Sequence, residues 1–217
     1  MQNLSNQKKG SLFAFIGVLF ITPDSLLIRL SNIETWGLLF YRGFIPFIVV
    51  LFGLILFYKT NFFKALINIG YTGIFYAISF SVCNVTFIIS IQNTSVANTL
   101  IMVAMAPMLS AFLGALFLKE APDKKTWLAI IITFLSVTFI FYDSVKLGNI
   151  LGDVFGFITA LGLAINANLA RYAKNRDLVP AAVIGKLGTA AFAFIFVKNF
   201  NLVNSDIIIV PLMCVLC

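Results

Sequence analysis

The chain has 217 residues, of which 61% are hydrophobic and 11% charged, and its mean hydropathy is +1.03. An average soluble domain is about 45–50% apolar and about 25% charged, so this composition excludes a soluble fold and predicts an integral membrane protein in a lipid bilayer. The net charge of +7 does not indicate nucleic-acid binding, because the basic residues lie in short gaps between apolar runs, where membrane topology explains them.

The apolar runs predict the membrane-spanning helices, since a hydrocarbon core about 30 Å thick needs about 20 apolar residues per helix. We predict spans at 11–30, 35–57, 66–90, 96–118, 126–142, 149–172 and 181–199, and an eighth that begins near Asp206 and stops at Cys217. The connections are short, so the fold class is an all-α membrane protein, a multi-pass helix bundle without an extramembrane domain. The first run passes directly into Pro23, Asp24 and Arg29 without a small-residue cleavage site, which favours a retained helix over a signal peptide.

Basic residues flank the spans unevenly, and such residues stay on the cytoplasmic side. With the N-terminus inside, ten of the fifteen lie at the cytoplasmic end: Lys8, Lys9, Lys59, Lys64, Lys119, Lys124, Lys125, Arg171, Lys174 and Arg176. The outer end has only Lys146 and Lys198, and three further cations lie within helices. We therefore expect a cell (inner or plasma) membrane location with a cytoplasmic N-terminus.

An internal repeat relates the first and sixth spans. Shifting the chain by 142 positions places 13–30 over 155–172, with Arg29 on Arg171 and Asp24 on Asn166. Five spans separate the copies, so they cross the membrane in opposite directions, as the inverted repeats of secondary transporters do. This predicts a first repeat at 1–147 (helices 1–5) and a partial second repeat at 148–217 (helices 6–8, the last incomplete).

The last run, 207–217, is about half a span long, and a chain that stops inside hydrocarbon leaves terminal polar groups unsatisfied. We expect a truncated sequence, with a short interfacial tail as the alternative.

Three segments resemble a known family. "LIMVAMAPMLSAFLGALFLKE" (100–120) has a mid-helix proline, small residues and a Leu-x-Glu exit; "LLFYRG" (38–43) carries a second-helix arginine; "ILGDVFGFITAL" (150–161) is similar to the opening of a second repeat. These patterns resemble the EamA domain of the drug/metabolite transporter superfamily. The resemblance covers nearly the whole chain. It implies a ten-helix carrier of two inverted five-helix repeats whose members move amino acids, metabolites, nucleotide sugars or drugs, often by exchange or proton coupling.

We therefore expect a secondary transporter that moves a small metabolite by alternating access. The sequence departs from the family pattern by ending in its eighth helix, so the alternative is a truncated, non-transporting protein that needs a partner chain. A membrane-embedded enzyme is less favoured, because eight acids and no histidine leave little for clustered acid–base chemistry. We expect no cofactor and no metal site.

Ionisable residues within spans are candidates for the substrate site, because charges are costly there. Asp24 and Arg42 each lie about 10 Å from the outer face on helices joined by a tight turn, so the two charges can meet. They either line a cavity that binds substrate or a proton, or form an ion pair that only fixes helices 1 and 2.

Lys186 lies about 8 Å from the cytoplasmic side. With Arg42 it would place one cation near each mouth, which suits an anionic or zwitterionic metabolite; the alternative is that Lys186 snorkels to the interface. Asn84, Asn98 and Asn166 add amides that bind substrate or hydrogen-bond neighbouring helices.

Small residues recur every fourth position at Gly148, Gly152, Gly156, Ala160 and Ala164. They indicate close helix packing within the chain or, as the second interpretation, a homodimer.

Overall fold

The computed structural model describes residues 12, 15, 23–59, 62–119, 123–147, 150–174, 176–200 and 206–216, and this part of the chain is helical without strands. Its elements, in chain order, are α2 (Asp24–Leu30), α3 (Thr35–Tyr58), α4 (Phe62–Asn68), α5 (Gly70–Asn93), α6 (Val96–Val103), α7 (Ala106–Phe117), α8 (Lys124–Leu147), α9 (Ile150–Tyr172), α10 (Val179–Phe196) and α11 (Asp206–Leu216).

The helix bounds follow the predicted spans closely from residue 35 onward, and the all-α multi-pass fold class is confirmed. Five helical stretches in the described residues are long and apolar enough to cross a membrane: Thr35–Tyr58, Gly70–Asn93, Val96–Phe117, Ile150–Tyr172 and Val179–Phe196. α8 has the same 24-residue length as α3 and α5. Most of the predicted first span lies outside the described residues, which resume at Pro23 and the short helix α2.

Two local features were not expected. The span predicted at 96–118 is two helices, because Pro107 lies at the start of α7, where it has no N–H to donate back to the turn before it. The chain before the third span forms the separate helix α4, and Gly70 begins α5 with a φ of +57°. This left-handed conformation favours glycine, and a Cβ there would also meet Arg176.

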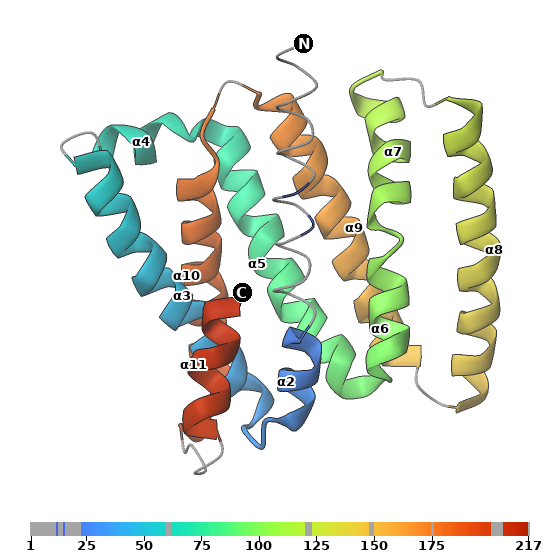
Figure 1. The fold of residues 1–217 in the computed structure, drawn as a ribbon, viewed down its shortest axis with the longest axis horizontal. Coiled ribbons are helices and arrows are strands. Elements are labelled where there is room, and N and C mark those ends of the chain that lie inside the picture. The colour runs from blue at the N-terminus through green and yellow to red at the C-terminus, as the bar shows by residue number, and fades with distance from the viewer. Residues whose placement is uncertain are drawn as a thin grey trace.

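Figure 1 shows the bundle as two groups of helices on either side of α5. α9 packs along α5 and continues onto α6 and α7, with α8 at the edge. On the other side α10 packs against both α3 and α5, while α11 lies against α3 and α2. The central helix α5 therefore joins residues of the first repeat to those of the predicted second repeat.

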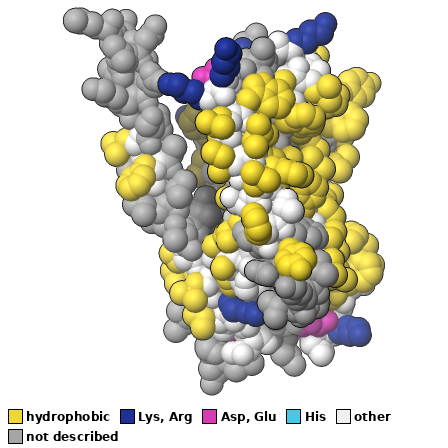
Figure 2. Space-filling model, turned by 90° about the vertical axis from the view of Figure 1, so that its right-hand side faces the viewer, with side chains coloured by type: hydrophobic (Ala, Val, Ile, Leu, Met, Phe, Trp, Pro, Cys, Tyr) yellow, Lys and Arg dark blue, Asp and Glu magenta, His cyan; other side chains and the backbone are white. Residues whose placement is uncertain are grey.

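The surface of the bundle is apolar between its two charged ends, as Figure 2 shows for the face beside α8. Large side chains on this and other faces are well exposed, such as Phe57 at 81% and Phe139 at 73%. On α8 the hydroxyls of Thr133, Ser136 and Thr138 donate to carbonyls four residues earlier. These polar groups thus find partners within their own helix, as a lipid environment requires.

The small residues of α9 pack inside the chain. A Cβ on Gly152 would lie 2.6 Å from backbone atoms of Asn93 and Thr94, and one on Gly156 would lie 3.0 Å from Met102 and Ser90. Ala160 and Ala164 are fully buried. Close packing within the chain, the first of the two interpretations, accounts for these four residues; Gly148 lies outside the described part.

α3 and α10 cross with their backbones in close contact at Gly43. A Cβ on Gly43 would lie 2.7 Å from the backbone nitrogen of Ala190 and 2.8 Å from the backbone oxygen of Lys186. Near one end of the same pair of helices, Trp36 stacks on Phe196 with ring centroids 4.8 Å apart. The backbones of α3 and α10 thus touch, and an aromatic contact fixes their relative rotation.

We predict that Gly43→Ala lowers the midpoint of thermal unfolding in detergent. Alanine is the better helix former by about 0.5–1 kcal/mol, but here its methyl group meets backbone that cannot rotate away, at a cost of about 1–3 kcal/mol. Gly53→Ala on the same helix is the matched control, because a Cβ there has no atom within 4 Å. Equal midpoints for the two variants would show that the crossing tolerates a methyl group.

Candidate functional site

Asp24 and Arg42 form a buried ion pair. Asp24 lies in the first turn of α2 and Arg42 two turns into α3, and the short connection folds these helices against each other. Arg42 donates through Nη1 to Oδ1 of Asp24 at 2.6 Å, with the residues only 6% and 2% exposed. The expectation that the two charges meet is confirmed.

Lys186 lies seven residues into α10 and is 8% exposed. Its Nζ donates to Oδ1 of Asn84 on α5 at 3.3 Å and lies 5.5 Å from the centroid of the Phe80 ring. The ammonium group therefore points into the bundle. The alternative that Lys186 snorkels to the interface is wrong.

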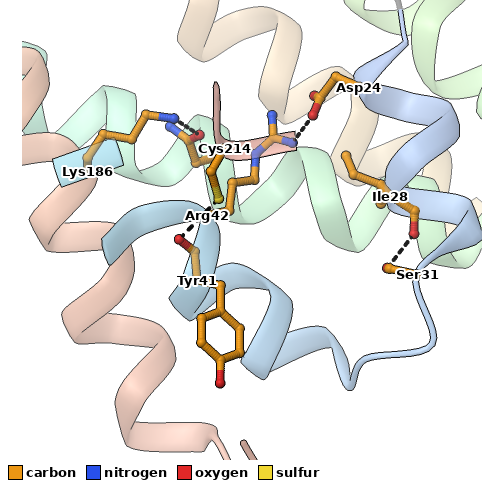
Figure 3. A network of polar contacts seen from close by, with 8 residues as sticks. Asp24, Ile28, Ser31, Tyr41, Arg42, Lys186 and Cys214 are labelled. Carbon is orange, nitrogen blue, oxygen red and sulfur yellow. Dashed lines mark hydrogen bonds and ion pairs between the residues drawn. The ribbon is translucent and has the colours of Figure 1, made fainter. Parts of the chain in front are cut away.

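The two cations share one face of α5. Phe80, Asn84 and Phe87 have the i, i+4, i+7 spacing of a single helix face. Lys186 lies over Phe80 and binds Asn84, while the guanidinium carbon of Arg42 is 5.6 Å from the Phe87 centroid. In Figure 3 Lys186 extends inward from α10, and Arg42 on α3 is directed at Asp24.

The depth expected for the cations needs correction. The sequence placed Arg42 near the outer mouth and Lys186 near the cytoplasmic mouth. In the structure α3 and α10 touch at Gly43, next to Arg42, and the backbone oxygen of Lys186 is one of the atoms nearest to a Cβ placed there. The two cations therefore lie at one level. The expected depths differed because Arg42 was counted from the outer end of α3 and Lys186 from the cytoplasmic end of α10, and each residue lies about two turns into its helix.

The other two predicted site residues lie elsewhere. Asn166 on α9 directs its amide nitrogen at the Sγ of Cys83, 4.0 Å away. Cys83 belongs to the face of α5 that packs on α9, about 100° around the helix from Asn84. Asn98 lies in the first turn of α6, where its amide donates to Thr94 and its backbone N–H to Ser95. The structure brings neither residue to the group formed by Asp24, Arg42, Asn84 and Lys186.

Two contributors to the group were not identified from the sequence. Phe80 and Phe87 present their ring faces to the cations, an arrangement that stabilises a desolvated charge by about 2 kcal/mol. The sequence signal that could have identified them is their spacing, four residues before and three residues after Asn84, which places all three on one helix face. α11 also reaches the group, since the thiol of Cys214 donates to the backbone oxygen of Tyr41 at 3.5 Å, beside Arg42 (Figure 3).

Contacts at the predicted outer end tie the α2–α3 connection to its neighbours. Arg29 donates to the carbonyl of Ile91 at 2.8 Å, and Thr35 binds the side chain of Gln92 at the end of α5. The backbone N–H of Asn32 donates to Asp206 at 3.1 Å. These bonds hold α2, α3, α5 and α11 together on the outer side of the ion pair.

The chemistry that the group can perform is recognition of charge. Two cations, one carboxylate and one amide lie together, with aromatic rings beside the cations. Among the described residues no cluster of three or more Cys, Asp and Glu side chains could hold a metal ion. The arrangement therefore suits an organic anion better than a metal.

Comparison with known families decides the class of protein. The sequence model of the EamA-like transporter family matches residues 8–142, which is more than half of the chain. The chain belongs to the EamA-like transporter family. Membership makes it a multi-pass membrane protein of a family that transports small molecules. No curated protein and no solved structure matches it.

We predict that Arg42 and Asp24 stabilise the fold as a pair. Removing one partner from a buried pair costs about 3–5 kcal/mol, whereas replacing both by apolar residues is often neutral. Arg42→Met and Asp24→Leu should each lower the unfolding midpoint in detergent, and the double variant should unfold above either single variant. Lys198→Met, which removes an exposed cation, serves as control. Additive losses in the double variant would contradict coupling.

Proposed function

We propose that the chain carries a small metabolite bearing a carboxylate or phosphate, and that Asp24, Arg42, Asn84 and Lys186 form its binding site. Family membership supports transport of a small molecule. The observation that supports the substrate class is the presence of two buried cations beside one face of α5, with the carboxylate of Asp24 bound to Arg42.

Charged side chains inside the bundle carry an energetic cost that a function would offset. A charge at the centre of a membrane helix costs about 2.5–3.5 kcal/mol on insertion scales, so a bundle held only by packing would not need them. One ion pair accounts for Asp24 and Arg42. Lys186 adds a second cation beside this pair, so the described residues of the group present two cations to an anionic substrate.

Each residue has a distinct role in the proposed site. The guanidinium of Arg42 has the fork geometry that binds carboxylate or phosphate through two hydrogen bonds, and Lys186 supplies a point charge. Asn84 positions Lys186, and its amide nitrogen, which donates one hydrogen to the carbonyl of Phe80, has a second hydrogen to donate to a substrate. Asp24 holds Arg42 in place when the site is empty, and it would receive the ammonium group of a zwitterionic substrate.

The transport step would be alternating access, with the predicted repeats moving around this group. The bonds of Arg29, Asn32 and Thr35 would form the outer gate, and Tyr58 with Asp177 a contact at the cytoplasmic end. This assignment of sides uses the predicted cytoplasmic N-terminus. The driving force would be exchange or an ion gradient.

The first experiment measures binding. Purified protein is mixed with a panel of amino acids, dicarboxylates, sugar phosphates and, as a neutral comparison, free sugars, and the unfolding midpoint is recorded. A ligand at 100 times its Kd stabilises the folded state by about 2.7 kcal/mol. We expect stabilisation by one of the anionic or zwitterionic classes. A response to free sugars alone would contradict the proposed substrate class.

The second experiment tests the residues in proteoliposomes, with the compound that stabilises the protein. Arg42→Lys retains the charge but loses the fork, and we expect at least a tenfold loss of uptake, as we do for Lys186→Gln. Lys198→Gln is the matched control, because Lys198 is an exposed cation at the end of α10. Unchanged uptake in both site variants would remove these residues from the site.

A further inference from the structure

Asp153 is a buried acid that the proposed substrate site does not use. It lies in the first turn of α9 and is 0% exposed. Neither of its carboxylate oxygens has a hydrogen-bond partner in the structure. Asp24 is also buried but pairs with Arg42, so the two acids differ in whether their carboxylate has a partner.

The surroundings of Asp153 leave little room for a bound metal ion. On α9 its neighbours Gly152 and Gly156 lie directly against α5 and α6, with a Cβ at either position 3.0 Å or less from the nearest atom. Gly156 contacts Met102, so the register of the parallel helices α6 and α9 brings Thr99, three residues before Met102, level with Asp153. The hydroxyl of Thr99 is already bonded to Ser90 at 2.8 Å.

No described cation lies opposite Asp153. α9 packs against α5, α6, α7 and α8. α6 and α7 contain no titratable residue, and the last two turns of α5, from Thr86 to Asn93, contain none either. α8 ends here with Tyr142, Asp143 and Lys146; Tyr142 is exposed, and the other two side chains lie outside the described part.

An ionised carboxylate in such a place is expensive. A buried charge without a partner costs far more than a buried neutral group, and proteins avoid this cost by neutralising the side chain. A proton neutralises Asp153 without needing space, whereas a sodium ion needs several oxygen ligands that the tight helix contacts do not provide.

We propose that Asp153 is the proton-coupling site of this transporter, protonated in the conformation described here. The coupling role rests on the proposed function, whereas the protonation of Asp153 does not. Asp153 lies about 5 Å into α9 from its start at the predicted outer end. When α9 separates from α6, water reaches the carboxylic acid, which gives its proton to water and leaves a hydrated carboxylate. Closure requires that a hydronium ion return the proton, with water as the product.

The first test uses stability and does not depend on a substrate. The unfolding midpoints of wild type and Asp153→Asn are compared from pH 5 to pH 8. At these pH values an exposed aspartate is ionised, so unfolding releases the proton that the folded chain holds on Asp153. Raising the pH therefore favours unfolding of the wild type. We expect the wild-type midpoint to fall by several degrees relative to Asp153→Asn. A difference that does not change with pH overturns the proposal.

Chemical labelling covers the case in which Asp153→Asn folds poorly. Dicyclohexylcarbodiimide reacts with protonated carboxyl groups in apolar surroundings, and mass spectrometry of the wild type locates the adduct. We expect the label on Asp153 at pH 7, at least tenfold above Asp24, which is the internal control because it is buried but bound to Arg42. Equal labelling of both acids, or none on Asp153, overturns the proposal.

The coupling role is tested in proteoliposomes. Asp153→Asn should lose accumulation driven by a proton gradient but retain counterflow exchange, since its binding site is intact. Loss of both activities in the variant, with both present in the wild type, overturns a coupling role. A wild type without any uptake refutes the proposed function instead, and leaves the two tests above to decide the protonation of Asp153. A sodium-specific effect would overturn the assignment of the proton. It would appear as a higher unfolding midpoint in sodium chloride than in choline chloride for the wild type but not for Asp153→Asn, and it would indicate that Asp153 binds sodium.

Discussion

The contact of α3 with α10 at Gly43 is the constraint on which the other features depend. Because Gly43 has no side chain, the backbones of the two helices touch, and the residues beside the contact, Arg42 and Lys186, come to one level. Both cations then reach the same face of α5, where Phe80, Asn84 and Phe87 receive them. The absence of a side chain at Gly43 thus lets the cations of α3 and α10 reach one face of α5 at the same level.

The structure divides its polar groups between two uses. Hydroxyls and amides bond across the contacts of α9 with α5 and with α7, as Thr86 does with Thr159 at 2.7 Å and Asn168 with the carbonyl of Ser110 at 3.0 Å. These bonds join the helices and leave no charge to neutralise. The charged groups lie beside the neighbouring face of α5 and near the start of α9, where, in our proposal, a substrate and a proton bind. In this proposal, packing and transport use different faces of the same helices.

Much of the fold could be predicted from the sequence, because membrane spans depend on length and hydrophobicity alone. The bounds of α3, α9 and α10 agree with the predicted spans to within a few residues, and the meeting of Asp24 with Arg42 followed from a short turn and the cost of a buried charge. The relative depth of Arg42 and Lys186 could not be predicted, since it depends on where two helices cross. Asn166 was placed in the site by its repeat position, yet the rotation of α9 directs it at Cys83, and a sequence repeat does not specify that rotation. Asp153 was visible only as part of a family pattern, because the absence of a partner is a property of the packed structure.

The ring stack of Trp36 on Phe196 has a consequence for observing the molecule. The chain has only two tryptophans, and the other, Trp127, lies on α8 at the far edge of the bundle. Trp36 stacks on Phe196 and meets Phe192 edge-on, so its indole senses how α3 and α10 are placed relative to each other. Replacing Trp127 by phenylalanine leaves a single tryptophan, which can be excited selectively over the six tyrosines, at the joint between the two predicted repeats. The protein therefore carries its own optical reporter of the motion by which a transporter of this kind would open and close.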